Sequence, residues 1–369
     1  MKLLNLGASA IVLGLIFSSC TSVKEHDSNL IAPKMDSLMN NLPDFSGVIL
    51  VATDGKVRYH KAFGFKDYEK RSPLDTANIF ELASVSKQFT AMVIMILKEE
   101  GKLDYDDSLS SYIPGLPYKG ITIRHLLTHT SGLPDYQDVM DQHWDKTKVA
   151  SNDDNISYLI KYHPGILSPP GDKYEYSNTG YMLLASVAEK ASGTDFIEFC
   201  RQRIFTPLRM QSTDIRTRDE KKNIANFAPG YIYVEDKHRY VAADSFPEFN
   251  YTIWLGDRKG PGRISSTSSD LLKWDRALYT ENLVKQTTLN EAFSPMKLTS
   301  GSLSNYGFGW EIVPPADNGR IVLHTGDNPG YKTAIIRYVD SNKTIIVLSN
   351  NASESINSIV SFIQRQLAQ

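Results

Sequence analysis

The sequence has little of what marks several large classes of protein. It holds two cysteines in 369 residues, Cys20 and Cys200, a formal net charge of −2, and no internal repeat or low-complexity tract. Two cysteines cannot build the disulfide framework of a small secreted domain. Balanced charge without a basic face argues against nucleic acid as a partner.

Long apolar runs are also scarce, and the notable one lies at the N-terminus. Lys2 precedes an apolar run at residues 8–17, and small residues then lead to Cys20. A basic start, a short apolar core and small residues before a cleavage point are typical of an export signal, and the run is too short for a membrane span. We therefore predict a signal peptide at residues 1–19 and a polar tether at residues 20–35.

The position of Cys20 resembles the processing site of a bacterial lipoprotein, in which this cysteine becomes the lipid-bearing first residue of the mature chain. The resemblance implies lipidation at Cys20 and a mature protein anchored by lipid to a membrane of the cell envelope, in the periplasm or at the outer membrane. Phe17 stands where such signals usually carry leucine, so a soluble periplasmic protein is the alternative. Cys200 would then remain alone, and we expect it to be a buried thiol.

Residues 36–369 have the composition of an ordinary globular protein, with 41% hydrophobic residues in the whole chain. Runs rich in β-branched and aromatic residues occur only near the two ends of this region, so we expect both ends to share one antiparallel sheet with helices against it. The predicted elements are a hairpin at 45–64, strands at 320–324, 332–339 and 344–349, and a helix at 355–367. Helical patterns fill the middle. The sequence thus predicts an α/β (α+β) fold with a mostly helical subdomain inserted at about 84–255.

Ser84 and Lys87 stand at the beginning of the most informative stretch. The apolar segment that follows them reads as a buried helix, which ends at Gly101. Residues three apart lie about one turn from each other, so the Lys87 amine can reach the Ser84 hydroxyl. A serine must lose its proton as it attacks, and burial favours a neutral amine that can take it. Ser-x-x-Lys alone is also common as a solvated helix face, so partners elsewhere must support a nucleophile.

Two further groups of polar residues lie where a cleft can use them. Tyr176 and Asn178 follow a turn-rich loop and precede an apolar helix, although Asn178 is equally well explained as a helix cap. His324, Thr325 and Gly326 end a strand, and the glycine there would allow another backbone segment to approach closely.

The order and separation of these three groups resemble those of the penicillin-recognising serine hydrolases. The closest group looks like the class C β-lactamases, with relatives among DD-peptidases, D-aminopeptidases and esterases. The resemblance covers about residues 35–365 and includes two other stretches common in that family, 122–133 and 326–331. It implies a β-lactamase/transpeptidase-like fold and acyl transfer to water through an acyl-enzyme, without metal or cofactor.

The resemblance also implies roles for individual residues. Ser84 is similar to the acylated nucleophile, Lys87 to its amine partner, and Tyr176 to the tyrosine that shuttles protons; which of Lys87 and Tyr176 is the base stays open. The backbone N–H groups of Ser84 and Asp327 would form the oxyanion hole, each donor contributing ~3 kcal/mol. The substrate, a small molecule or a peptide, would contact Asn178, His324, Thr325, Gly326 and Asp327.

His324 departs from the lysine that β-lactamases proper carry at this position. A lysine is a permanent cation for a substrate carboxylate, whereas histidine is largely neutral at pH 7. We therefore expect esters or D-amino peptides to be better substrates than penicillins, and carboxylate-bearing substrates to gain affinity as the imidazole protonates near pH ~6. A class C-type β-lactamase is the alternative enzyme. A catalytically idle binding lipoprotein of the cell envelope is the alternative outside enzymes.

His125 and His129 form a pair four residues apart that could in principle bind zinc. No third ligand accompanies the pair, and the stretch resembles a structural segment of the family. We therefore predict no metal site.

Overall fold

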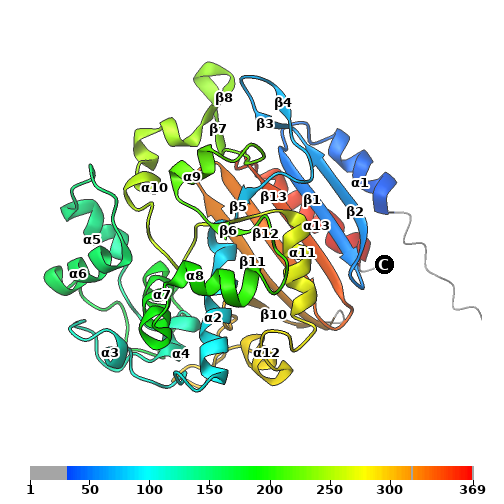
Figure 1. Ribbon diagram of the computed structural model, residues 1–369. Coiled ribbons are helices and arrows are strands. Elements are labelled where there is room, and N and C mark those ends of the chain that lie inside the picture. The colour runs from blue at the N-terminus through cyan, green and yellow to red at the C-terminus, as the bar shows by residue number, and fades with distance from the viewer. Residues whose placement is uncertain (1–30, 317–318, 368–369) are drawn as a thin grey trace, which may run out of the picture.

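The computed structural model describes residues 31–316 and 319–367. Its centre is a six-stranded sheet with the strand order β10-β11-β12-β13-β1-β2, in which every neighbouring pair is antiparallel. Gly47 of β1 lies opposite Ser349 of β13, so the two ends of the chain share one sheet, as predicted (Figure 1). The strands are β1 (Gly47–Thr53), β2 (Lys56–Phe63), β10 (Glu311–Ala316), β11 (Gly319–Asn328), β12 (Tyr331–Tyr338) and β13 (Lys343–Ser349).

Both faces of the sheet are covered. Val48 and Leu50 of β1 belong to one hydrophobic core, and Ile49 and Val51 belong to another. Successive strand residues point to opposite faces, so a continuous apolar run marks a strand buried on both sides. One core lies beneath α1 (Ile31–Asn40) and α13 (Ser355–Leu367), and the other lies beneath the helices of the middle of the chain (Figure 1).

Helix α1 begins inside the segment predicted as a polar tether, so that prediction is wrong for residues 31–35. Met35 and Met39 are one turn apart and are buried against the sheet. On the same helix, the Asp36 carboxylate accepts a hydrogen bond from the hydroxyl of Tyr59 at 2.9 Å. The apolar spacing of this short amphipathic helix outweighs its polar neighbours. The predicted signal peptide and Cys20 lie outside the described residues.

Helix α2 (Lys87–Glu99) is the central helix of the larger core, as predicted. Its residues are buried from Lys87 to Leu97, because α7 (Asn178–Ser192) packs along it and the sheet lies behind it. Gly101 follows the helix with a φ of 68°, a left-handed conformation that glycine adopts without steric cost.

The segment between the two parts of the sheet carries the other helices and three small strand groups. The predicted insertion at about 84–255 falls in this segment, and its apolar side chains share one core with β1 and β13. The remaining helices are η1 (Ala83–Ser86), α3 (Leu109–Tyr112), α4 (Ile123–Leu127), α5 (Tyr136–His143), α6 (Asn152–Tyr162), α8 (Phe196–Cys200), η2 (Arg201–Phe205), α9 (Arg218–Lys222), η3 (Glu235–Lys237), η4 (Ala243–Ser245), η5 (Pro247–Phe249), α10 (Tyr251–Trp254), α11 (Ser268–Ala277) and α12 (Gln286–Ala292). The small strand groups are β3 (Phe65–Asp67) with β4 (Ser72–Pro73), β5 (Phe80–Glu81) with β9 (Ile264–Ser266) and β6 (Asp214–Ile215), and β7 (Tyr231–Val234) with β8 (Arg239–Ala242).

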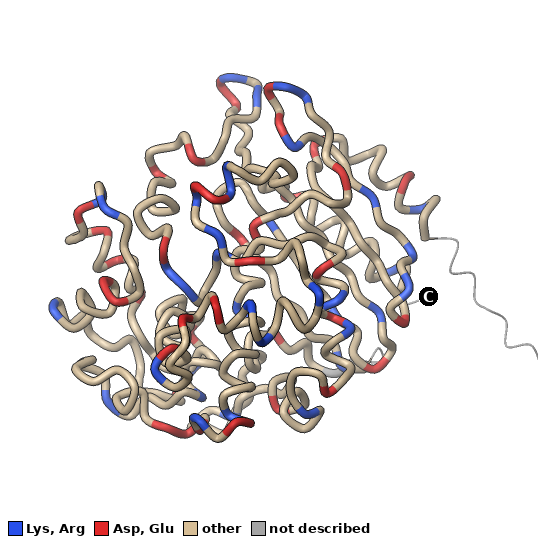
Figure 2. Tube along the Cα trace, in the orientation of Figure 1, with Lys and Arg blue, Asp and Glu red and all other residues tan. Residues whose placement is uncertain are grey.

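Charged residues of both signs are interspersed along the described part of the chain (Figure 2). Cys200 is a buried free thiol, as predicted. Within residues 31–316 and 319–367, no helix combines the length and the apolar composition that a membrane span requires.

Candidate active site

Ser84 lies in the one-turn helix η1, directly before α2. The preceding residue, Ala83, has a φ of 49°, which is uncommon for a non-glycine residue and typical of constrained functional sites. Ser86 in the same turn is buried, and its Oγ accepts the N–H of Ile264 at 3.2 Å. Ser84 lines a cavity of about 120 Å³, and Ser86 does not.

Lys87 is fully buried beside this serine. Its Nζ lies 3.0 Å from Ser84 Oγ, 2.9 Å from Asn178 Oδ1 and 2.9 Å from the carbonyl oxygen of Pro261. The amide and carbonyl oxygens can only accept, so they take both N–H groups of a neutral amine, whose lone pair then faces the Ser84 hydroxyl. Burial and the nearby positive charge of Arg258 lower the pKa of Lys87 well below its usual range. The amine is arranged to accept the proton of Ser84.

Tyr176 borders Lys87 on another side. The centre of its ring lies 4.7 Å from Lys87 Nζ and 4.3 Å from the ring centre of His129. The residue keeps 44% of its surface exposed, and the rings of His129 and Tyr306 pack against the remainder. This burial raises the pKa of Tyr176 above its usual value, and a hydrogen bond to Ser84 only partly opposes it. The phenol therefore holds its proton at neutral pH and can donate it.

Asn178 is the first residue of α7, and Ser177 is the cap of that helix. Ser177 Oγ accepts the N–H of Gly180 at 3.1 Å, so the interpretation of Asn178 as a helix cap is wrong. Asn178 instead lines the cavity of Ser84 while its Oδ1 accepts from Lys87. Within the described part of the chain, its amide NH₂ group has no hydrogen-bond partner and is available to a bound molecule.

His324 is buried, and both of its ring nitrogens are engaged. Nδ1 lies 2.6 Å from the carbonyl oxygen of Thr325, so in the neutral ring Nδ1 carries the proton. Nε2 then accepts from the hydroxyl of Tyr306 at 2.8 Å. Burial, together with the nearby Lys87, lowers the pKa of His324 to about 3. The expectation that this imidazole becomes a cation near pH 6 is therefore wrong.

Gly326 brings strand β11 against the nucleophile turn, as its residue type predicted. A Cβ at this position would lie 2.3 Å from the carbonyl oxygen of Leu82 and 2.3 Å from Thr333 Oγ1. Thr333 Oγ1 donates to the same Leu82 oxygen at 2.8 Å. The strand and the turn are thus held at a fixed and short separation.

The residues on either side of Gly326 differ in whether they line the cavity of Ser84. Asp327 lines the cavity of Ser84, and Thr325 does not. Thr325 instead lines a crevice beneath α13, together with Ile356 and Val360. The predicted contact of Thr325 with a substrate at Ser84 has no support in this arrangement, whereas the position of Asp327 agrees with the predicted oxyanion hole.

The sequence analysis missed the loop at residues 256–263, which contributes three groups to the site. Pro261 supplies a carbonyl oxygen to Lys87, and Arg258 and Arg263 line the cavity of Ser84. The glycines and the proline of this segment predict a loop, which is a signal for structure but not for chemistry.

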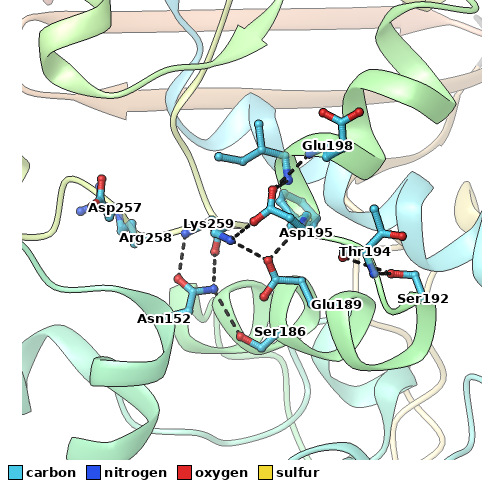
Figure 3. A network of polar contacts seen from close by, with 12 residues as sticks. Asn152, Ser186, Glu189, Ser192, Thr194, Asp195, Glu198, Asp257, Arg258 and Lys259 are labelled. Carbon is cyan, nitrogen blue, oxygen red and sulfur yellow. Dashed lines mark hydrogen bonds and ion pairs between the residues drawn. The ribbon is translucent and has the colours of Figure 1, made fainter.

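A network around Lys259 anchors this loop (Figure 3). Lys259 Nζ donates to Glu189 Oε1 and to Asp195 Oδ2, each at 2.6 Å. Asn152 Oδ1 accepts the backbone N–H of Lys259 at 2.8 Å, and its Nδ2 donates to the Lys259 carbonyl at 3.2 Å. The segment that faces Lys87 is therefore fixed to α6, α7 and α8.

His125 and His129 have structural partners. His125 Nδ1 accepts the N–H of Thr122 at 3.1 Å and completes a capping box at the start of α4. His129 Nδ1 accepts the N–H of Ser177 at 3.0 Å. Among the described residues, no three His, Cys, Asp or Glu side chains are grouped so that they could hold a metal ion.

Comparison with known proteins identifies relatives of this chain. A family model described as Beta-lactamase matches residues 35–358. Penicillin-binding protein 4* of Bacillus subtilis (strain 168) is 42% identical over 312 residues, which cover 84% of this chain and 69% of that protein. The putative penicillin-binding protein PbpX of the same strain is 26% identical over 346 residues, covering 90% of this chain and 77% of that protein.

Solved structures share the fold. The octameric penicillin-binding protein homologue from Pyrococcus abyssi matches with a TM-score of 0.79 at 27% identity, covering 92% of this chain and 78% of that one. A penicillin-binding protein from Bacillus halodurans matches with a TM-score of 0.77 at 27% identity, covering 90% and 98%. The D-amino acid amidase from Ochrobactrum anthropi SV3, at 22% identity, a TM-score of 0.73 and coverage of 91% and 98%, supports the fold alone. The chain therefore has the β-lactamase/transpeptidase-like fold that its sequence predicts, and it belongs to the Beta-lactamase family of serine hydrolases.

Proposed function

We propose that this protein hydrolyses an ester or a D-amino peptide through an acyl-enzyme formed on Ser84. The observation that carries the proposal is the environment of Lys87, a buried amine 3.0 Å from Ser84 Oγ whose other two neighbours can only accept hydrogen bonds. Such an amine is an activated base for a serine nucleophile. It would have no purpose in a catalytically idle binding protein.

In the first half of the reaction, Ser84 Oγ bonds to the carbonyl carbon of the substrate and its proton passes to Lys87 Nζ. The carbonyl oxygen becomes an oxyanion, which the backbone N–H groups of Ser84 and Asp327 would stabilise. When the tetrahedral intermediate collapses, the bond to the leaving group breaks and the leaving group takes the proton of the Tyr176 hydroxyl. Lys87 then returns its proton to Tyr176, so the acyl-enzyme forms with no net gain or loss of protons.

In the second half, a water molecule replaces the leaving group. It attacks the acyl carbon as one of its protons passes to Lys87 Nζ, and the bond to Ser84 Oγ breaks as Lys87 returns a proton to this oxygen. The depressed pKa of Lys87 and the raised pKa of Tyr176 support the lysine as the base and the tyrosine as the acid.

The neutral His324 supports esters or D-amino peptides over penicillins, because it offers no cation to the β-lactam carboxylate. The names of the relatives from Bacillus subtilis favour penicillin recognition, so a class C-type β-lactamase is the second candidate.

The test is hydrolysis of a panel of activated esters, D-amino acyl amides and penicillins by the wild type, Ser84→Ala and Ser86→Ala. We expect esters or D-amino amides to have the highest kcat/KM, Ser84→Ala to lose all turnover, and Ser86→Ala to keep it. Full turnover by Ser84→Ala would show that Ser84 is not the nucleophile. Penicillins as the best substrates would favour the β-lactamase.

We also propose that a lipid on Cys20 anchors the mature protein to a membrane of the cell envelope. The support is the sequence around the cysteine, because the segment lies outside the described residues. Membrane fractionation of the wild type and Cys20→Ser tests the proposal, since only the acyl chains would hold the protein there. A wild type found entirely in the soluble fraction would contradict it.

A further inference from the structure

A second and larger cavity, of about 460 Å³, adjoins the cavity of Ser84. Glu81, Arg258, Arg263 and Asn328 line both cavities, so a molecule held at the nucleophile can extend from one into the other. Ser84 lines only the smaller one. The larger cavity can therefore accept a part of the substrate that lies beyond the reacting carbonyl.

Basic side chains dominate this cavity, and several already have carboxylate partners. Lys221 Nζ lies 2.6 Å from Glu81, and Arg218 Nε lies 2.7 Å from Asp244. Glu81 also accepts from the Asn328 amide at 2.7 Å. Glu81 and Asp244 thus each have a cationic partner in direct contact, and the Glu81 charge acts on Arg258 and Arg263 only through space.

Two arginines that line both cavities, Arg258 and Arg263, have no carboxylate oxygen at hydrogen-bonding distance among the described residues. The Arg263 side chain is only 7% exposed, its nearest carboxylate oxygen belongs to Asp257 at 3.8 Å, and it makes a single hydrogen bond, to the Arg258 carbonyl at 3.3 Å. The Arg258 guanidinium forms no hydrogen bond or ion pair with any other residue in the described ranges. A guanidinium has five N–H donors, so both groups are suited to an incoming anion. For Arg263, which is buried, a charge left unpaired is also costly.

The loop that carries these arginines is rigid enough to form a binding site. Lys259, which follows Arg258 in the chain, is fixed by Glu189, Asp195 and Asn152 (Figure 3). Burial lowers the pKa of Arg263 from its usual value, and its charge therefore lacks the stabilisation that a bound anion would provide. Arginine is the side chain best matched to the two oxygens of a carboxylate or phosphate.

We propose that Arg258 and Arg263 bind an anionic group, a carboxylate or a phosphate, that the substrate carries beside its scissile carbonyl. The part of this inference that rests on the proposed function is that the anion belongs to the substrate. His324 is buried and neutral, so these two arginines take the role of anion recognition that a cation at position 324 of β11 would otherwise have.

The kinetic test compares two esters that differ only in a terminal carboxylate or its neutral carboxamide, with a third that ends in a phosphate. The variant is Arg258→Gln. The control is Arg203→Gln, which removes the same charge at another place. Arg203 pairs with Glu100 at the C-terminal end of α2, about 20 Å from Lys87 by the rise of a helix. Because Arg258 also lowers the pKa of Lys87, its loss slows every ester. The readout is therefore the ratio of kcat/KM for the anionic ester to that for the neutral one.

We expect Arg258→Gln to lower this ratio about ten- to a hundredfold, the usual effect of a lost hydrogen bond to a charged group, and Arg203→Gln to leave it unchanged. The arm with the larger wild-type ratio identifies carboxylate or phosphate as the ligand. Equal ratios in the wild type and Arg258→Gln would overturn the proposal.

Calorimetric titration of Ser84→Ala with succinate and with inorganic phosphate tests the site without turnover. We expect binding of at least one of them, and its loss in the double variant Ser84→Ala/Arg258→Gln. If Ser84→Ala binds an anion but the wild type hydrolyses no ester, the anion site is retained and the proposed function is rejected. Ester hydrolysis without binding of either anion, and with a ratio unaffected by Arg258→Gln, would reject the anion site and retain the function.

Discussion

Gly326→Ala is expected to disable the enzyme by steric displacement alone. The new Cβ would lie 2.3 Å from the carbonyl oxygen of Leu82, against an ordinary contact of 3.4 Å or more. That oxygen belongs to the backbone two residues before Ser84, so no side-chain rotation relieves the contact. Strand β11 or the nucleophile turn must move by about 1 Å.

A displacement of this size has a large effect on the catalytic rate and a moderate effect on the stability of the fold. Misplacing reacting groups by about 1 Å costs on the order of a hundredfold in rate, and overpacking a core costs about 1–3 kcal/mol. We expect kcat/KM of Gly326→Ala on an activated ester to fall about a hundredfold. We expect its Tm to fall by several degrees while the chain still folds.

Gly165→Ala is the matched control, because a Cβ there meets no atom within 4 Å. It should leave both kcat/KM and Tm close to the wild type. The two variants are compared in a steady-state assay and a thermal melt. Wild-type kcat/KM in Gly326→Ala would show that the approach of β11 to the turn does not set the geometry of the site.

Three further predictions follow from the groups around Ser84. Lys87→Met keeps a long side chain but removes the base, so we expect acylation to slow by a factor of about 10²–10⁴ in single-turnover assays; a loss below tenfold would exclude Lys87 as the base. Tyr176→Phe should slow esters with poor leaving groups far more than activated ones, because only the former need a proton; equal losses in paired kcat measurements would contradict this role. The folded-state pKa of His324 is about 3, below the unfolded value, so the unfolded chain binds more protons between pH 3 and 6.5 and the native state loses stability as pH falls. Relative to His324→Asn, urea unfolding should show an extra loss of about 2 kcal/mol between pH 6.5 and 4.5, and parallel pH profiles would refute the burial argument.

The sheet and the nucleophile helix were predictable because the hydrophobic pattern of their residues indicates which faces are buried. The β-branched runs at both ends of the chain belong to strands buried on two faces, and an apolar segment bounded by Gly101 belongs to a core helix. The edge strand β10 was not predicted, because Pro314 and Pro315 interrupt its pattern. Proline is tolerated there since an edge strand can leave a position without an N–H donor.

The site was predictable in its residue types and less so in its charges. The positions of Ser84 and Lys87 follow from helical spacing, which is a local property. The pKa of His324 depends on burial and on Lys87, and its hydrogen bond depends on Tyr306, which no local pattern connects to it. The alternation of strand residues puts Thr325 on the face opposite His324 and Gly326, a local signal that the prediction of Thr325 as a substrate contact did not use.

The pH dependence of covalent labelling at Ser84 tests the central claim most directly. The measurement is the rate at which a fluorophosphonate modifies the protein, with the labelled peptide identified by mass spectrometry. A neutral, buried Lys87 predicts label on Ser84 alone and a rate that reaches its plateau well below the ordinary pKa of lysine, about 10.4. Label on another residue, or a rate that still rises tenfold per pH unit up to pH ~10, would contradict the account.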